Sequence, residues 1–451
     1  MSHEIEALSD PVAAFIRAAT VSREAHNSGT LDEADAILVR HPGVASRNIH
    51  TAAILADEAR VRAFLAEDPG RASAKGGPDG WDALTHLCFS RYLRLDRSRS
   101  DAYVSTARAL LDAGANANTG WYETIDHPNP RQVIEAAIYG AAGIAQHAGL
   151  TRLLLERGAD PNDEETPYHV PETYDNTVLR VLLDSGRFNP TSLSWLLLRK
   201  CDWHDFDGLR LVLDRGGDPN AIPRFGRSAF HHALTRDNSI EAIALLLDRG
   251  ADPALRDSTG RSAIEIAARR GRGDALRLFK ERGVSLDLQG IDRLVATCAL
   301  DDGKSTRTLL EQEPGLKHGL MERGGALLAE FSGTGNVQGV RNLLECGVAV
   351  DALYAGDPYF DIAKDSTALH VAAWRASHGV VRALIARGAP VDARDGKGRT
   401  PMMLAVKACV DSYWRRLRRP DSVKALLDAG ASAGGIQLPC GYDDVDALLM
   451  S

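Results

Sequence analysis

Residues 250–283 read GADPALRDSTGRSAIEIAARRGRGDALRLFKERG, and this stretch decides the fold. It opens with a Gly-Ala-Asp-Pro turn, in which glycine tolerates positive φ and proline cannot continue the preceding helix. A second turn follows at residues 257–260, where short polar side chains and a glycine favour a tight reversal. Two patterns of helical spacing come next, one with Ile264, Ala267 and Ala268 on a single face and one with Ala275, Leu278 and Phe279. Another glycine turn begins at Gly283, so the stretch predicts one unit of a stacked helical repeat.

The glycine that ends this unit recurs along the chain. A helix end made of apolar residues, polar residues and a glycine is found at Gly114, Gly158, Gly186, Gly216, Gly250, Gly283, Gly315, Gly347, Gly388 and Gly430. Neighbouring glycines are 28 to 44 residues apart, and most steps are close to 33. Upstream, proline replaces the glycine turn as the terminator in ILVRHPG (37–43) and FLAEDPG (64–70). The pattern predicts an all-α solenoid of about eleven stacked helix-turn-helix units.

Composition and charge bound the class of protein. Hydrophobic residues make up 44% and charged residues 25% of the chain, as in ordinary globular proteins. Its 451 residues would suggest about three domains by length alone, but a repeat array has one core that continues along the stack. The net charge of -8 argues against general nucleic-acid binding, which needs a basic face against phosphate.

Cysteine usage and the N-terminal residues indicate the compartment. The six cysteines have neither CxxC pairs nor metal-finger spacing. Residues 1–20 contain acids and only a short apolar run, so they do not resemble a secretory signal. No stretch approaches the roughly 20 apolar residues that span a bilayer. We therefore expect a cytoplasmic protein without a membrane segment, and no cofactor is indicated.

The residues that open several helices carry a family resemblance. They read Thr-Ala-Leu-His-Val-Ala at 367–372, Thr-Pro-Met-Met-Leu-Ala at 400–405 and Ser-Ala-Phe-His-His-Ala at 228–233. A Thr or Ser at a helix start caps free amides, proline suits the first turn, and alanine permits close stacking. The chain resembles ankyrin repeat proteins, whose helix-opening pattern is Thr-Pro-Leu-His-x-Ala. The resemblance implies turn or β-hairpin fingers at the rim of a concave, partner-binding face. It also implies that His231 and His370 bond to a neighbouring turn.

The resemblance varies along the chain and suggests a division into segments. We expect a helical cap at 1–43, degenerate repeats at 44–115, irregular repeats with long fingers at 116–220, regular repeats at 221–283, degenerate repeats at 284–347, repeats with insertions at 348–434 and a tail at 435–451.

Three consecutive units depart most from the pattern. Residues 116–132 form an oversized turn region rich in aromatic and charged side chains. Residues 162–176 place Pro171 where a helix interior is expected, at a cost of ~3 kcal/mol in a regular helix, so this unit should be distorted. Residues 199–207 carry aromatic, acidic and imidazole groups in the loop between paired helices. Because the units are adjacent, stacking should bring the three stretches side by side.

These stretches and the next finger supply the predicted binding residues. They are Trp121, Tyr122, Glu123, His127, Tyr168, His169, Tyr174, Asp175, Asp202, Trp203, His204, Arg224 and Phe225. Exposed aromatic residues among charges are typical of a protein-binding rim. We therefore expect an intracellular binding protein that takes a protein or peptide partner on its concave face.

Two other interpretations stay open. The histidines and carboxylates of residues 116–207 would suit a metal, a small ligand or acid-base catalysis, and Cys201 with His204 three residues on is a nucleophile candidate. No HExxH-type spacing is present, so no residue is assigned to catalysis or to a metal. The third interpretation is a structural scaffold in which no single patch dominates binding.

Two basic inserts lengthen the repeats that end at Gly114 and Gly430. They read RYLRLDRSR (91–99) and WRRLRR (414–419). Such charge runs are usually solvated faces, and local binding of phosphate or an acidic partner is the alternative.

Overall fold

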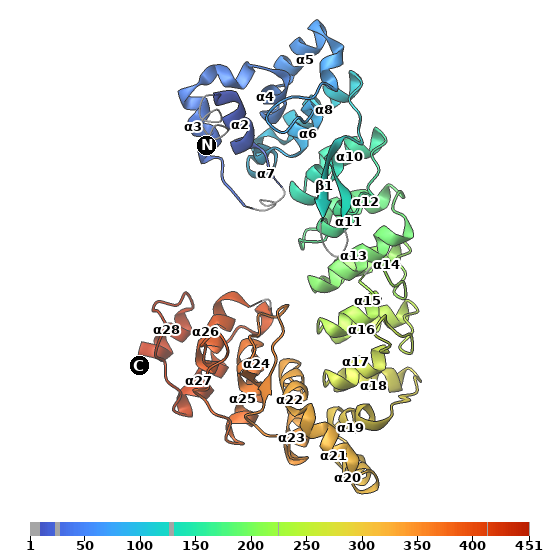
Figure 1. The fold of residues 1–451 in the computed structure, drawn as a ribbon, viewed down its shortest axis with the longest axis vertical. Coiled ribbons are helices and arrows are strands. Elements are labelled where there is room, and N and C mark those ends of the chain that lie inside the picture. Colours follow the sequence, from blue (N-terminus) through green and yellow to red (C-terminus); the bar gives the residue numbers. More distant parts are fainter. Residues whose placement is uncertain (1–9, 23–27, 126–129, 224, 413, 451) are drawn as a thin grey trace. The chain divides into compact units, whose positions relative to one another are not determined.

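The structure is a computed structural model that describes residues 10–22, 28–125, 130–223, 225–412 and 414–450. Two of the predicted site residues, His127 and Arg224, lie outside the described residues. The chain divides into two compact units, residues 1–229 (unit 1) and residues 230–451 (unit 2). Figure 1 labels the elements of each unit along the colour ramp.

Unit 1 consists of short helices and one β-hairpin. The helices are α2 (Pro11–Ala19), α3 (Asp32–Arg40), α4 (Ile49–Ile54), α5 (Glu58–Glu67), α6 (Ala83–Cys88), α7 (Arg91–Leu95), α8 (Ser100–Asp112), α9 (Ala137–Tyr139), α10 (Ala148–Glu156), α11 (Glu165–His169), α12 (Thr177–Asp184), α13 (Pro190–Asp202) and α14 (Phe206–Asp214). The antiparallel hairpin is formed by β1 (Gly120–Ile125) and β2 (Arg131–Ala136). Along the stack, α4 packs on α6, α8 on α10, and α10 on α12.

Unit 2 continues the same kind of repeat. Its helices are α15 (Ala229–Thr235), which starts at the boundary, α16 (Ile240–Asp248), α17 (Ala263–Arg269), α18 (Gly273–Glu281), α19 (Gly290–Ala299), α20 (Gly303–Gln312), α21 (Gly315–Glu322), α22 (Gly324–Gly333), α23 (Val337–Glu345), α24 (Ala368–Trp374), α25 (His378–Ile385), α26 (Pro401–Asp411), α27 (Asp421–Asp428) and α28 (Asp443–Met450). Two short strands, β3 (Leu353–Tyr354) and β4 (Ser366–Thr367), pair in a second finger.

The predicted all-α solenoid is confirmed. Between α4 and α27 the described residues contain the successive pairs α4/α5, α6/α8, α9/α10, α11/α12, α13/α14, α15/α16, α17/α18, α19/α20, α22/α23, α24/α25 and α26/α27, which makes eleven. The buried apolar side chains lie mainly on the faces between these helices, so each unit has a core that runs along its stack.

The glycines that close the units adopt the conformation that the sequence predicted, with one exception. Gly250 has φ 87° and Gly283 has φ 75°, the left-handed region that favours glycine at a helix end. Gly315 was predicted to end a helix, and this prediction is wrong. The helix α20 ends at Gln312, and Gly315 begins α21 instead. Pro314 stops the helix here, as the prolines do after α3 and α5.

The residues in the helix-opening slots make the bonds that the pattern implies. Ser262 Oγ accepts a hydrogen bond from the Glu265 amide at 3.2 Å, and the Glu265 carboxylate accepts one from the Ser262 amide at 2.8 Å. His370 Nε2 lies 3.0 Å from the Ala393 carbonyl, and His231 Nε2 lies 2.9 Å from the Leu255 carbonyl. Each histidine therefore ties its helix to the following turn.

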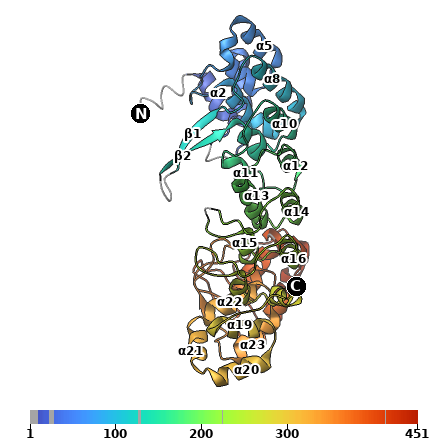
Figure 2. The same ribbon diagram turned by 90° about the vertical axis from the view of Figure 1, so that its right-hand side faces the viewer.

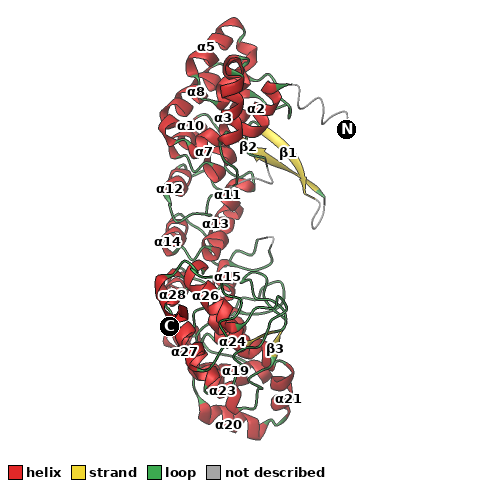
Figure 3. Ribbon diagram, turned by 90° about the vertical axis from the view of Figure 1, so that its left-hand side faces the viewer, coloured by secondary structure: helices red, strands yellow, loops and turns green. Residues whose placement is uncertain are grey.

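The irregular stretches fold in two different ways. Where the sequence predicted an oversized turn at residues 116–132, the chain forms the β1–β2 hairpin, which runs on to Ala136. Aromatic and β-branched residues make up most of β1, and Val133 and Ile134 lie in β2, which favours a hairpin over a loose turn. Figures 2 and 3 show the hairpin extending from the helices of unit 1. In the next stretch α11 has only five residues and ends at His169, two residues before Pro171.

Candidate functional site

The predicted aromatic residues of unit 1 fall into three ring clusters. The first lies at the hairpin: Trp121 stacks on Trp81 with ring centroids 4.0 Å apart and meets the edge of Phe89 at 4.3 Å. Trp81 and Phe89 are buried, so Trp121 is largely a packing residue that holds the hairpin on α6. Its neighbour Tyr122 points the other way along the strand and is 68% exposed.

The second cluster, which we call the ring strip, consists of Tyr168, Trp195 and Phe225. Tyr168 and Trp195 have centroids 5.9 Å apart, and Trp195 and Phe225 have centroids 4.6 Å apart, both in edge-on contacts. The three residues come from α11, from α13 and from the loop after α14, and α11 packs on α13. Phe225 is 49% exposed. The strip therefore runs across the first helices of two successive pairs and onto the next finger.

The third cluster, the loop pair, consists of Tyr174 and Trp203, whose rings meet edge-on at 5.7 Å. Tyr174 lies between α11 and α12, and Trp203 lies between α13 and α14. These are the loops inside the helix pairs, whereas Phe225 lies in a loop between pairs. Tyr174 is 55% exposed.

Tyr139 lies between the first two clusters, with its ring 5.9 Å from Phe89 and 5.3 Å from His169. His169 in turn meets Tyr168 at 4.9 Å. Ring contacts therefore join the first cluster to the ring strip, whereas the loop pair lies in the loops inside the helix pairs.

Arg199 connects the second irregular stretch with the third. Its guanidinium lies 4.2 Å from the Tyr168 ring centroid and donates to Glu172 Oε1 at 2.5 Å and to Asp202 Oδ2 at 2.7 Å. An ion pair between Arg131 of β2 and Glu164 connects the hairpin with the second stretch in the same way. The three irregular stretches are therefore in contact with one another in chain order.

His169 lies in an acidic environment beside the ring strip. Its Nε2 is 3.1 Å from Glu165 and its Nδ1 is 3.3 Å from Glu172. Burial alone would lower the pKa of His169, but the hydrogen bonds and charges of the two glutamates outweigh it and raise the pKa to about 9. His169 is therefore a cation at neutral pH.

Other predicted site residues serve the local fold. Asp175 accepts hydrogen bonds from the Thr177 amide and hydroxyl at 2.9 and 2.6 Å, next to the start of α12. Asp202 pairs with Arg199, and His204 occupies the turn after α13 with φ 51°. Glu123 accepts from Trp121 Nε1 at 3.1 Å. Asp175, Asp202 and Glu123 thus each have a partner within the fold.

Cys201 does not have the environment of a nucleophile. Its side chain is buried in α13, and burial, followed by the charge of Asp202, raises the pKa of the thiol well above its ordinary value. Among the described residues, no three or more His, Cys, Asp and Glu side chains are grouped so that they could hold a metal ion. In the same part of the chain, no helix has both the length and the apolar composition needed to cross a membrane.

The sequence did not predict the buried polar groups that hold the second and third irregular stretches together. Lys200 is fully buried and donates to Asp205 Oδ2 and to the Thr173 carbonyl, both at 2.8 Å. Asp205 also accepts from Asn176 Nδ2 and from the Gly208 amide, each at 2.9 Å, and so connects both irregular loops with α14. Trp195 was missed as well. The spacing of four residues between Trp195 and Arg199, which places both on one helix face, was the available signal.

Stacked helix pairs joined by short turns, with fingers between the pairs, define a helical-repeat solenoid. The chain is an ankyrin repeat protein: the model of the family described as Ankyrin repeats (3 copies) matches residues 197–289 and 326–434. Residues 1–196, 290–325 and 435–451 lie outside the match, and residues 290–325 lie where the repeat motif is lost. Ankyrin repeats are in general protein–protein interaction modules.

Comparison with individual proteins adds a distant likeness. The structure described as the ankyrin repeat domain of Bcl-3, a unique member of the IkappaB protein family, is 19% identical over 53% of this chain and 98% of that chain, with a TM-score of 0.23. No match was found among curated proteins.

Proposed function

We propose that the irregular repeats of unit 1 bind a protein or peptide partner on their concave face, with the ring strip at the centre of the contact. The observation that carries this proposal is the continuous line of rings from Tyr168 through Trp195 to Phe225, of which the last is half exposed. Aromatic side chains in a fixed arrangement lose little entropy on binding and are the usual anchors of protein interfaces.

The surroundings of the ring strip suggest the chemistry of the partner. Residues 162–207 contain nine Asp and Glu residues against four Lys and Arg residues. Of the four cations, Lys200 is buried against Asp205 and Arg199 is held by two carboxylates. A partner segment that presents apolar side chains together with basic ones therefore fits this surface best. Attraction between opposite charges speeds association, and repulsion between like charges disfavours acidic competitors.

Tyr122 extends the proposed surface onto the hairpin. It is exposed on β1, and the Arg131–Glu164 ion pair holds the other strand against the stretch that precedes α11. This contact supports a hairpin finger that flanks a partner segment along the ring strip.

Selection of binding peptides provides the test. Peptides selected from a displayed random library against the full chain would be measured against wild type, Trp195→Ala/Phe225→Ala and Tyr174→Ala/Trp203→Ala. We expect the first variant to bind at least ~10-fold more weakly, because loss of an anchor costs more than about 1.4 kcal/mol. The second variant removes a comparable ring pair from the loops inside the helix pairs, so it serves as the matched control and should lose less.

Equal affinity of the wild type and the Trp195→Ala/Phe225→Ala variant would contradict the proposal. Circular dichroism melting of each variant would verify that the fold is kept, so that a loss of binding reports the surface and not unfolding.

A further inference from the structure

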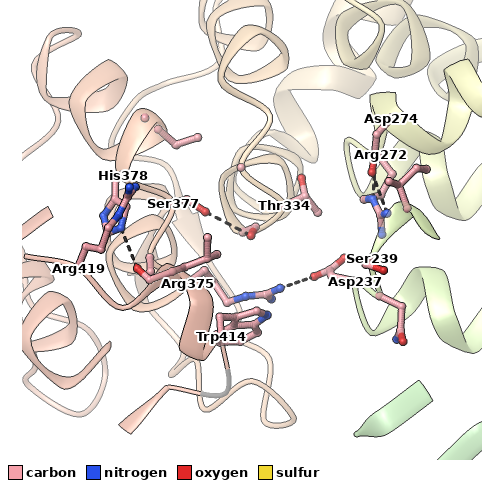
Figure 4. Close-up of a pocket in the computed structure, with 18 of the residues that line it drawn as sticks. Asp237, Ser239, Arg272, Asp274, Thr334, Arg375, Ser377, His378, Trp414 and Arg419 are labelled. Atoms are coloured by element: carbon pink, nitrogen blue, oxygen red, sulfur yellow. Dashed lines mark hydrogen bonds and ion pairs between the residues drawn. The ribbon is translucent and has the colours of Figure 1, made fainter. Parts of the chain in front are cut away.

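Unit 2 contains a pocket that the repeat pattern did not predict. Its volume is about 440 Å³, a size that suits a small ligand. It is lined by the loop after α15, the starts of α16, α18 and α25, the turn between α22 and α23, and the basic insert before α27. Figure 4 shows Arg272 and Asp274 on one side, His378 and Arg419 on the other, and Arg375 with Trp414 between them.

Close packing of helix pairs that are not consecutive in sequence builds this pocket. Asn336 Nδ2 donates to the carbonyls of Gly271 and Ala299 at 2.7 and 2.9 Å, and α17 packs on α22. Gly271 has φ 69°, and a Cβ atom at this position would lie 2.4 Å from the ring of Phe331. Only glycine allows the two turns to approach so closely.

A buried ion network forms the floor of the pocket. Asp237 is bonded by Arg270 at 2.6 and 2.8 Å and by Arg375 at 2.7 Å, although 138 residues separate Asp237 from Arg375. Burial alone would raise the pKa of Asp237, but the charges of Arg270 and Arg375 outweigh it and lower the pKa below its ordinary range. The Arg375 guanidinium is also 4.0 Å from the ring centroids of Phe360 and Trp414. The floor is thus fixed before any ligand binds.

The lining residues carry more positive than negative charge. The cations are Arg272, Arg375, Arg382 and Arg419, and the anions are Asp237 and Asp274. Arg382 and Arg419 are exposed, with Arg419 Nε 3.5 Å from Asp421 Oδ2, and a ligand from solution can reach both side chains. The insert that carries Arg419 is held in place by His378, whose Nε2 lies 3.0 Å from the Leu417 carbonyl and whose Nδ1 lies 2.7 Å from Ser422 Oγ.

Two buried donors at this pocket lack an acceptor among the described residues. They are Nη1 of Arg272 and Nε of Arg375, and both side chains are more than nine-tenths buried. Buried donors without an acceptor are rare in proteins and point to an ion or a water that completes the site. Three helices, α16, α18 and α25, also begin in the lining, and a helix N-terminus attracts anions through its free amides and its dipole.

From these features we propose that the pocket binds a small phosphate-bearing anion. The phosphate would lie between the Arg272 and Arg375 side chains and the start of α25, with Arg382 and Arg419 closing on it from the exposed side. Arginine suits this role because its planar donors match phosphate oxygens. The proposal concerns a second site, in unit 2, and does not depend on partner binding by unit 1.

Calorimetric titration of the full chain with inorganic pyrophosphate tests the proposal. We expect saturable binding with one site per chain. The variant Arg382→Ala/Arg419→Ala should bind at least ~10-fold more weakly, since it removes two charged contacts. The matched control Arg277→Ala/Arg307→Ala changes the net charge equally at exposed positions of unit 2 outside the lining, and should stay within about twofold of wild type.

A third variant changes the affinity in the opposite direction. The Asp274 carboxylate accepts from Arg272 at 2.9 Å and competes with an incoming anion for that guanidinium. Asp274→Asn keeps the shape of the side chain and removes its charge, so it should bind pyrophosphate several-fold more tightly. A purely structural role of the Arg272–Asp274 pair would give no such gain.

These measurements distinguish a specific anion site in the pocket from non-specific attraction of pyrophosphate to positive charge. Equal weakening by the pocket variant and the control variant, weaker binding by Asp274→Asn, or no saturable binding would each overturn the proposal. Hydrogen exchange gives a second readout: pyrophosphate should slow exchange at residues 375–382 and leave residues 303–312 unchanged.

Discussion

At the scale of single residues, the histidines of this chain have two physically different roles. His370 has a structural role: its Nδ1 lies against Thr367 at the start of its own helix and its Nε2 against the Ala393 carbonyl of the next turn. Burial lowers its pKa. His169 has the same side chain between two glutamates, and its pKa is raised to about 9. Position relative to the repeat predicts the first role, whereas the second depends on side chains that only the folded chain brings together.

The raised pKa of His169 predicts a pH dependence of local stability. A group whose folded pKa exceeds its unfolded value stabilises the fold fully below the unfolded pKa of about 6.5, and this stabilisation is lost as the pH rises through about 9. The effect is on the order of 3 kcal/mol at most. Hydrogen exchange of α11 in His169→Gln should therefore be faster than in wild type at pH 6.5, and the two should converge near pH 10.

Comparison with the variant at the same pH removes the intrinsic pH dependence of exchange. If the ratio of the two exchange rates stayed constant from pH 6.5 to pH 10, His169 would not be held as a cation by Glu165 and Glu172.

Residue chemistry also explains why part of the site could not be predicted. Trp195 is followed by Leu196, Leu197 and Leu198, so by sequence it reads as one more core position of α13. Lys200 reads as a solvated charge, yet it is fully buried because Asp205 and the Thr173 carbonyl compensate it. The environment of Lys200 leaves no periodic signal, and the four-residue spacing of Trp195 and Arg199 indicates only a shared helix face.

At the scale of elements, the helix pairs follow the repeat pattern, and the irregular stretches depart from it for reasons that lie in their own residues. Pro171 predicted a distorted unit, and α11 is indeed cut to five residues. The family resemblance implies turn or β-hairpin fingers without deciding which form residues 116–132 take, because an insertion in a repeat can extend as a loop or pair with itself. The alternation of side chains along β1 matches this pairing: Trp121 faces the buried rings of Trp81 and Phe89 at the two ends of α6, and Tyr122 faces solvent.

The two faces of β1 predict unequal effects of neighbouring substitutions on stability. Trp121→Ala removes a ring stacked on Trp81, and should lower the stability of unit 1 by roughly 2–3 kcal/mol. Tyr122→Ala should change stability by less than about 0.5 kcal/mol, because its side chain is exposed. Thermal melting compares the two directly. A Tyr122→Ala variant that melts as early as Trp121→Ala would contradict the assigned faces.

At the scale of the molecule, the fold was the most predictable feature, and the sites were the least. A period near 33 residues with a glycine at most helix ends recurs along the chain, so the fold is predictable even though single positions such as Gly315 depart from the pattern. A fold of this kind hosts many functions, so the specific surfaces had to come from geometry. Unit 1 offers the ring strip, and unit 2 offers an arginine-lined pocket formed by residues that are up to 182 positions apart, from Asp237 to Arg419.

The central claim is that a partner lies along the ring strip, and a footprint tests it most directly. Hydrogen exchange of the full chain would be measured with and without a selected binding peptide. The account predicts slower exchange in α11, in α13 and around Phe225. Protection confined to α12, α14 or unit 2, with these segments unchanged, would contradict it.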